Sequence, residues 1–153
     1  NATTSGLTAV VLGSDVTNNN AVANTIADVT GLSFSVLANK TYYFKFVIRY
    51  TAAAATTGSR WGVNCTAGLA TNLTFTSEYT LTATTSTRNA MVQAFDSPAA
   101  SNATSVVAVN KAIIEGHFTP TADGTFIARF ASEVANSAIV AKAGSVVYYQ
   151  QTN

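Results

Sequence analysis

The clearest feature of the chain is an alternation of apolar and polar residues with a period of two. In the segment from Thr41 to Tyr50, every second residue is apolar or aromatic: Tyr42, Phe44, Phe46, Ile48 and Tyr50. A second segment, Leu73 to Thr84, alternates apolar residues with Thr and Glu. Successive side chains of a strand point to opposite faces of a sheet, so both segments predict strands with one buried face. The wholly polar face of the second segment is typical of an antiparallel sheet with one solvated side.

The same alternation predicts further short strands separated by turn residues such as Asp123-Gly124, a good hairpin signal. The predicted strands are Leu7–Leu12, Leu32–Leu37, Arg60–Asn64, Asn89–Phe95, Ser105–Val109, Ala112–Phe118, Thr125–Ala131, Ala138–Ala141 and Ser145–Gln150. The predicted turns include Asn18-Asn19-Asn20, Thr30-Gly31 and Asp96-Ser97-Pro98. Ser132 to Ala138 is the one helix candidate, and it is short and uncapped.

This density of strands predicts an all-β fold, namely a single antiparallel β-sandwich domain of jelly-roll type covering residues 1–153. We expect roughly the first 14 residues to form an extended arm, and a segment to precede Asn1, which is not Met. We also expect the strands Thr41–Tyr50 and Leu73–Thr84 to pair with each other. The predicted core of that pair is Phe44, Phe46, Ile48, Phe75, Tyr79 and Leu81.

Composition adds a prediction about the surface. Hydrophobic residues make up 48% of the chain and charged residues only 10%, against roughly 25% charged residues in a typical soluble protein. Thr, Ser, Asn and Gly must therefore form much of the solvent face. Because few charges keep neighbouring copies apart, we expect a large permanent protein–protein interface.

Several classes of function are disfavoured. The net charge is +1 and no basic patch is visible, so we expect no nucleic-acid partner. No apolar run reaches the roughly 18 residues of a membrane span, and no signal peptide is visible. The single cysteine, Cys65, allows no internal disulfide and is expected to be a small buried side chain. One His and one Cys do not make a structural zinc site, so we expect no metal and no cofactor.

We expect no catalytic residue. The only histidine, His117, lies two residues from Glu115, so both side chains would share one strand face. Such a pair could orient a nucleophile, but a charged pair on an outer face is the stronger interpretation. The seven acidic residues are scattered along the chain, which disfavours the paired carboxylates of a glycosidase.

Non-catalytic ligand binding stays open. Trp61, with Arg60 and Asn64 beside it, could form an aromatic platform for a sugar. The alternative, which we favour, is that Trp61 is a core or interface aromatic.

Four charged residues in apolar strands suggest a contact between subunits: Arg49, Glu115, Arg129 and Glu133. Arg and Glu are rarely buried unless paired, so a neighbouring copy could cover and pair them. An ordinary pair within one chain is equally compatible with the sequence.

Several of these segments resemble a recurring β-domain of tailed-bacteriophage virion proteins. The resemblance rests on residues 26–34, 38–46 and 56–61, and on residues 112–116, 124–134 and 142–145. It covers most of the chain from about Asp15 onward and carries no catalytic signature. One departure is Asn64-Cys65-Thr66, where similar proteins tend to have Asn-Gly-Pro.

The resemblance implies a homotrimeric jelly roll on the surface of a virion. The expected function is that of a non-enzymatic structural protein that decorates or cements a capsid, with the major capsid protein as partner. The alternative is a receptor-binding knob of a fibre or tail protein that binds host cell-surface glycan. A secreted enzyme is the third and least favoured class. Because fold does not fix function, these stay expectations.

Overall fold

The computed structural model describes residues 6–68, 70–97 and 106–153, and within them every regular element is a strand. The strands are β1 (Thr8–Val11), β2 (Val16–Asn18), β3 (Ala27–Val36), β4 (Tyr42–Ala52), β5 (Ser59–Cys65), β6 (Ala70–Thr80), β7 (Ser86–Val92), β8 (Asn110–Pro120), β9 (Gly124–Ser132), β10 (Ile139–Ala141) and β11 (Val146–Gln151). Most predicted strands overlap one of these. The all-β prediction is confirmed.

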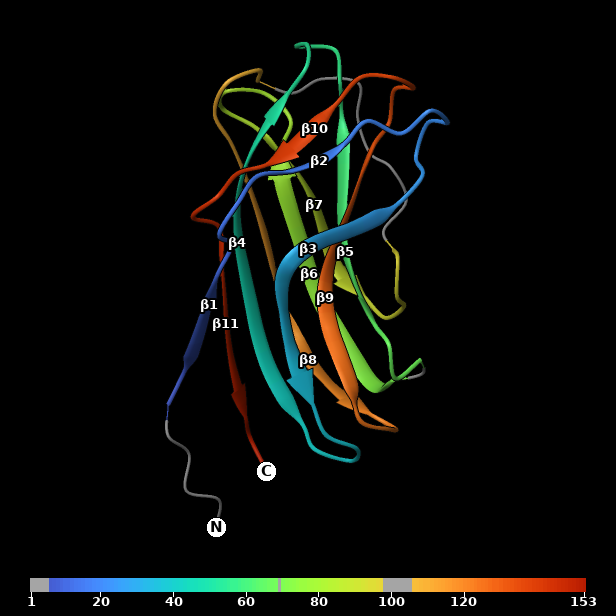
Figure 1. Ribbon diagram of the computed structural model, residues 1–153, viewed down its shortest axis with the longest axis vertical. Helices are drawn as coiled ribbons and strands as arrows, with labels where there is room; N and C mark the ends of the chain where they lie inside the picture. Colours follow the sequence, from blue (N-terminus) through green and yellow to red (C-terminus); the bar gives the residue numbers. More distant parts are fainter. Residues whose placement is uncertain (1–5, 69, 98–105) are drawn as a thin grey trace.

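The strands form two antiparallel sheets packed face to face (Figure 1). The large sheet has the order β1-β11-β4-β8-β6-β7, with β10 pairing β4 and β2 pairing β10. The small sheet has the order β3-β9-β5. From β3 to β6 the chain passes from one sheet to the other with each strand, and apart from the β6–β7 hairpin the paired strands are not consecutive in sequence. This is the antiparallel jelly-roll sandwich that the alternating pattern predicts.

The expected pairing of β4 with β6 is wrong, because β8 lies between them. β8 pairs with β4 through Phe46↔Ile114 and with β6 through Phe75↔Gly116. Gly116 permits this approach, since a Cβ there would lie 2.0 Å from the carbonyl oxygen of Thr74. Five of the six predicted core residues are at most 1% exposed, whereas Leu81 is only half-buried in the turn after β6.

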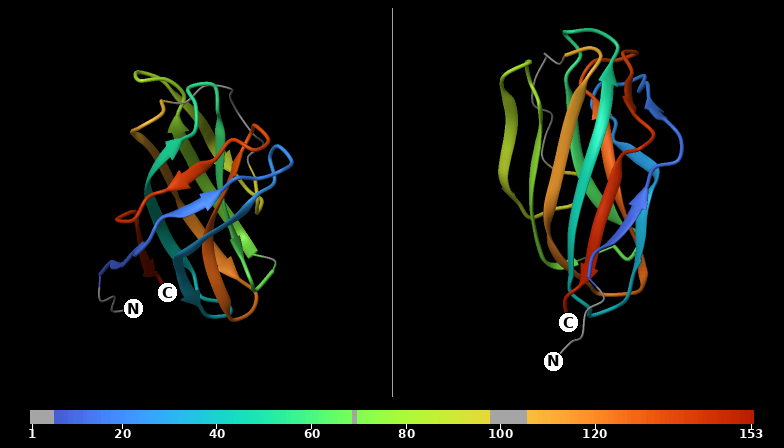
Figure 2. Two further views of the ribbon diagram at one scale, coloured as in Figure 1. Left: turned by 45° about the horizontal axis from the view of Figure 1, so that its top comes forward. Right: turned by 90° about the vertical axis from the view of Figure 1, so that its left-hand side faces the viewer.

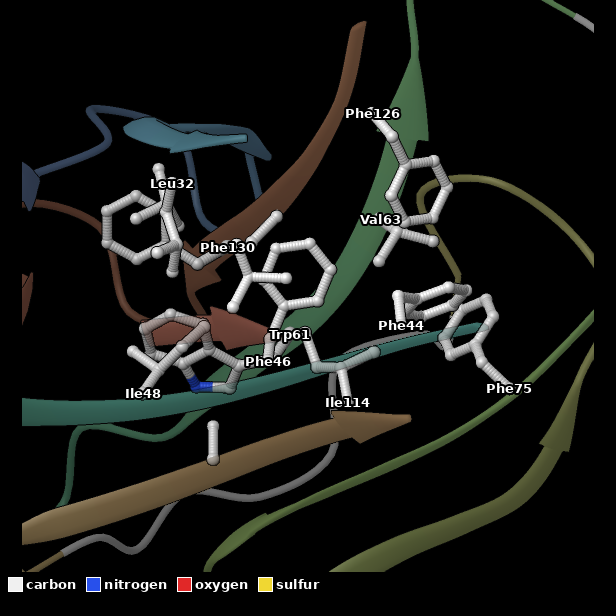
Figure 3. Close-up of a cluster of buried hydrophobic side chains, with 14 of the residues drawn as sticks. Leu32, Phe44, Phe46, Ile48, Trp61, Val63, Phe75, Ile114, Phe126 and Phe130 are labelled. Atoms are coloured by element: carbon white, nitrogen blue, oxygen red, sulfur yellow. The ribbon is translucent and has the colours of Figure 1, made fainter. Parts of the chain in front are cut away.

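Aromatic side chains from both sheets fill the space between them (Figure 3). Phe126 of β9 stacks on Phe118 of β8, with ring centroids 4.0 Å apart, and lies 4.7 Å from the ring of Phe44. Trp61 of β5 lies 5.0 Å from Phe130 and 4.8 Å from Tyr50. Stacked and tilted rings at these distances add to the stabilisation from burial.

Two turn predictions are wrong for physical reasons. Thr30-Gly31 lies inside β3, where the register with β9 shifts and Gly31 adopts a φ of 99°. The glycine therefore marks a β-bulge rather than a turn. Asn18 ends β2, and its Nδ2 donates to the carbonyl of Phe130 at 2.9 Å. The amide of Asn20 likewise bonds the backbone of Ser132.

Two further expectations fail in part. Ser132–Ala138 ends β9 and continues as bends and turns instead of a helix, and residues 106–109 form no strand. Ser105 lies outside the described residues. Residues 8–11 form β1, inside the predicted strand Leu7–Leu12, and pair with β11 along the edge of the large sheet.

Candidate functional site

The outer face of the small sheet gathers three of the predicted site residues around Asp96. The Asp96 carboxylate accepts hydrogen bonds from Arg129 Nε at 2.9 Å and from Asn64 Nδ2 at 2.7 Å. Arg60 donates to the backbone carbonyl of Asp96. Arg129 also forms an ion pair with Asp28 at 2.6 Å. We call Asp96, its three partners and Asp28 the Asp96 network.

Backbone geometry brings the Asp96 segment onto this face. The Asp96 N–H donates to the carbonyl of Val63 at 3.0 Å. A Cβ on Gly62 would lie 2.7 Å from the carbonyl oxygen of Ser97, so the bare glycine lets the segment cross β5. The hydrogen bonds from Arg129 to Asp96, and then those to Asp28, raise the pKa of Arg129, which stays charged. The network thus attaches a covering segment to the sheet.

These contacts decide between alternatives that the sequence left open for two residues. Arg129, a candidate for a subunit contact, instead pairs with Asp28 and Asp96 of the same chain. Trp61 is 0% exposed, so it is a core residue and no sugar can stack on it. Its Nε1 donates to Ser59 Oγ at 2.9 Å inside the core. Arg60 and Asn64 do lie together, but they bind Asp96.

Glu133 directly follows the last residue of β9 and is half-buried. Its Oε1 is buried without a hydrogen-bond partner, as is the Nε of Arg60. Burial raises the pKa of Glu133, partly offset by a hydrogen bond with the backbone of Gly58. Among the described residues, Glu133 makes no ion pair.

The outer face of the large sheet is different, because a row of apolar side chains crosses it. Val11, Val146, Val47 and Ile113 are direct neighbours across β1, β11, β4 and β8. We call these four residues the apolar stripe. Val11 is 60% exposed and the other three are half-buried. Tyr148, in the next row, is 37% exposed. The right-hand view of Figure 2 shows these strands side by side.

Two predicted interface residues, Arg49 and Glu115, lie on this same face and are exposed. Arg49 Nη2 donates to the carbonyl of Ala143 at 2.9 Å. Glu115 accepts a hydrogen bond from Tyr43, and burial together with this bond raises the pKa of Tyr43 to about 12. His117 lies beside the Tyr43 ring, with ring centroids 5.4 Å apart, and is exposed.

An open pocket of about 720 Å³ lies at one end of the large sheet's outer face. Its wall includes Val47 and Ile113 of the apolar stripe, the charged residues Arg49, Lys111 and Glu78, and the Thr-rich turn between β6 and β7. That hairpin stands at the edge of the sheet (Figure 2). The sequence alone did not identify this pocket, because its walls come from three separate segments.

Three further features concern metal ligands, membrane-spanning helices and the single cysteine. Within residues 6–68, 70–97 and 106–153, no group of three or more His, Cys, Asp or Glu side chains could hold a metal ion. Among the same residues no helix is long and apolar enough to span a membrane. Cys65 is 5% exposed and unpaired, as expected of a small apolar side chain, and burial raises its pKa.

No protein-family model and no curated protein sequence matches the chain. Solved structures with a similar arrangement include a chain of infectious bursal disease virus, Gt strain, at 8% identity and a TM-score of 0.48. That match covers 95% of this chain but only 32% of the viral one. Eiger TNF from S. frugiperda matches at 10% identity and a TM-score of 0.45, over 97% of this chain and 94% of that one.

A third match is the Clostridium thermocellum xylanase 10B CBM22-1–GH10 structure, at 8% identity and a TM-score of 0.38. It covers 97% of this chain and 29% of the xylanase chain. These identities and TM-scores are too low to assign any of these proteins' functions to this chain. What the structure establishes is an antiparallel jelly-roll sandwich whose two outer faces differ in cover.

Proposed function

We propose that this domain is a non-enzymatic structural protein of a virion surface, which associates with copies of itself through the outer face of its large sheet. The observation that carries the proposal is the apolar stripe. One side of each sheet is buried in a sandwich, so the other side is normally polar. Here four neighbouring strands place Val or Ile there instead.

The partner is a second copy of the chain, and the resemblance to virion proteins favours three copies in a closed ring. Low charge removes the usual repulsion between copies. Both signs of charge flank the stripe, with Lys45 and Glu115 direct neighbours across β4 and β8. A face that carries both signs can complement itself in a symmetric contact.

Decoration of a capsid, with the major capsid protein as partner, is the more specific part of the proposal. It rests on the sequence resemblance. Imaging the intact particle would test it by locating this chain on, or away from, the capsid lattice.

Self-association is tested by light scattering at micromolar concentration. The unaltered domain should have the mass of a trimer. Val146→Lys places a charge in the middle of the stripe and should give a folded monomer. Gln150→Lys, on the same strand and the same face but outside the stripe, is the matched control and should remain trimeric. A well-folded monomer for the unaltered domain would refute the proposal.

A further inference from the structure

The pocket beside the apolar stripe has two cations on one wall. Arg49 of β4 and Lys111 of β8 are directly opposite each other in the strand register and both are exposed. Like charges directly opposite one another destabilise a strand pair. In the described part of the chain, the ion pairs are made by Arg129 and Lys142, so neither Arg49 nor Lys111 has an acidic partner.

Asp15 interacts with Arg49 but is already paired with another cation. It is bound by Lys142 at 2.5 Å, and its pKa is lowered chiefly by that hydrogen bond, with Arg49 a minor contributor. Arg49 uses one nitrogen for the carbonyl of Ala143, which leaves guanidinium donors for another acceptor. An anion near the two cations would relieve their repulsion.

The rest of the pocket offers apolar contacts and a hydrogen-bond acceptor, so it can bind a ligand larger than a simple anion. Its lining includes Val47 and Ile113 of the apolar stripe and also Val106 and Val109, of which Val109 is 80% exposed. Glu78, which is opposite Ile113 in the strand register and also lines the pocket, accepts a hydrogen bond from Ser86 Oγ at 2.7 Å and keeps further acceptor capacity. A volume of about 720 Å³ is within the usual range for small-ligand sites.

We propose that this pocket binds a carboxylated sugar. The carboxylate lies between Arg49 and Lys111, where charge-assisted hydrogen bonds are strongest. The apolar face of the ring packs on Val106 and Val109, which line the pocket outside the apolar stripe, and a ring hydroxyl donates to Glu78. The proposal does not rest on self-association, although in a trimer the sugar would lie at the border of the subunit contact. A sugar site here would support the receptor-binding alternative.

The test is an NMR titration of the isotope-labelled domain with glucuronate, glucose and acetate as separate probes. Glucuronate should shift the backbone signals around Arg49, Glu78 and Lys111. Glucose lacks the carboxylate and acetate lacks the ring, so each should bind at least about tenfold more weakly. Binding of glucuronate should also weaken as salt is added.

The variant Arg49→Gln/Lys111→Gln should lose at least about tenfold in affinity for glucuronate. The control Lys40→Gln/Lys45→Gln changes the net charge equally outside the pocket and should bind within about twofold of the unaltered domain. Acetate binding as tightly as glucuronate, or equal losses in both variants, would overturn the proposal. Light scattering on the same samples shows separately whether self-association holds.

Discussion

The two outer faces of the sandwich differ in what covers them. On the small sheet, the Asp96 network holds a covering segment with hydrogen bonds from Arg129 and Asn64. On the large sheet, the apolar stripe stays at the surface, with Val11 60% exposed. Arg129, one of the charged residues that suggested a subunit contact, is thus paired within the chain. The surface left for a partner is apolar.

This contrast follows from the chemistry of the two faces. A charged group has a limited number of hydrogen bonds to make, and Arg129 makes its bonds to Asp28 and Asp96. Apolar side chains are stabilised by any cover that excludes water, including a second copy. A contiguous apolar patch on a sheet face is therefore a better indicator of association than a charge in a strand.

The largest effect is expected from the core that both faces share. Phe126→Ala removes the ring that packs on Phe118 and Phe44, and should lower the free energy of unfolding by about 3–5 kcal/mol. Urea denaturation measures this loss. Met91, on β7, is 67% exposed, and Met91→Ala should change stability by less than about 0.5 kcal/mol. Equal losses in the two variants would contradict the assigned core.

The covered face should show the next largest effect. Asp96→Ala leaves the half-buried Arg129 and Asn64 without their shared acceptor and releases the segment over β5. We expect a loss of about 1–3 kcal/mol in the free energy of unfolding. The matched control is Asp15→Ala, which breaks the more exposed pair with Lys142 and should cost less than about 1 kcal/mol. Urea midpoints that fall equally for both variants would show that the network does not hold the segment.

The open face should respond in association rather than in stability. Val11→Thr keeps the shape of an exposed side chain at the end of the stripe but adds a hydroxyl. The stability of the monomer should change by less than about 0.5 kcal/mol, while the dissociation constant of the assembly should rise several-fold. Sedimentation at a series of concentrations measures the second quantity. A lower unfolding midpoint with unchanged association would mean that Val11 belongs to the fold and not to a contact.

The sequence predicts the strands better than it predicts their neighbours. Alternation identified β4 and its inward row because burial of one face imposes a period of two. It did not show that β8 separates β4 from β6, because the order of strands in a sheet depends on contacts between segments that are far apart in sequence. The apolar stripe was missed as a unit for the same reason. Val11, Val47 and Val146 become neighbours only once the strand order is known.

The Asp96 network was equally invisible to the sequence. Asp96-Ser97 looks like a turn because Asp favours turns and adopts positive φ readily, and Asp96 does have a φ of 55°. What the pattern lacks is the contact of this turn with Gly62, which is more than 30 positions away. A glycine inside a predicted strand is the available signal for such a close approach.

The smallest predicted effect is a pH-dependent change in stability, which compares the half-buried Glu133 with Glu115 on the open face. Burial raises the pKa of Glu133 in the folded state, so the folded chain holds its proton more tightly than the unfolded chain. Stability from this group is therefore present below the ordinary pKa of Glu and is lost as the pH rises through the higher folded value. Glu133→Gln should remove this loss and stabilise the domain by about 0.5 kcal/mol at pH 7, or roughly 1–2 °C in Tm. Thermal unfolding at pH 4 and pH 7 measures the gain, which should be present only at pH 7. Glu115→Gln removes a carboxylate from the open face and is the control, with no such gain expected. If both variants gain equally at pH 7, net charge rather than burial of Glu133 is responsible.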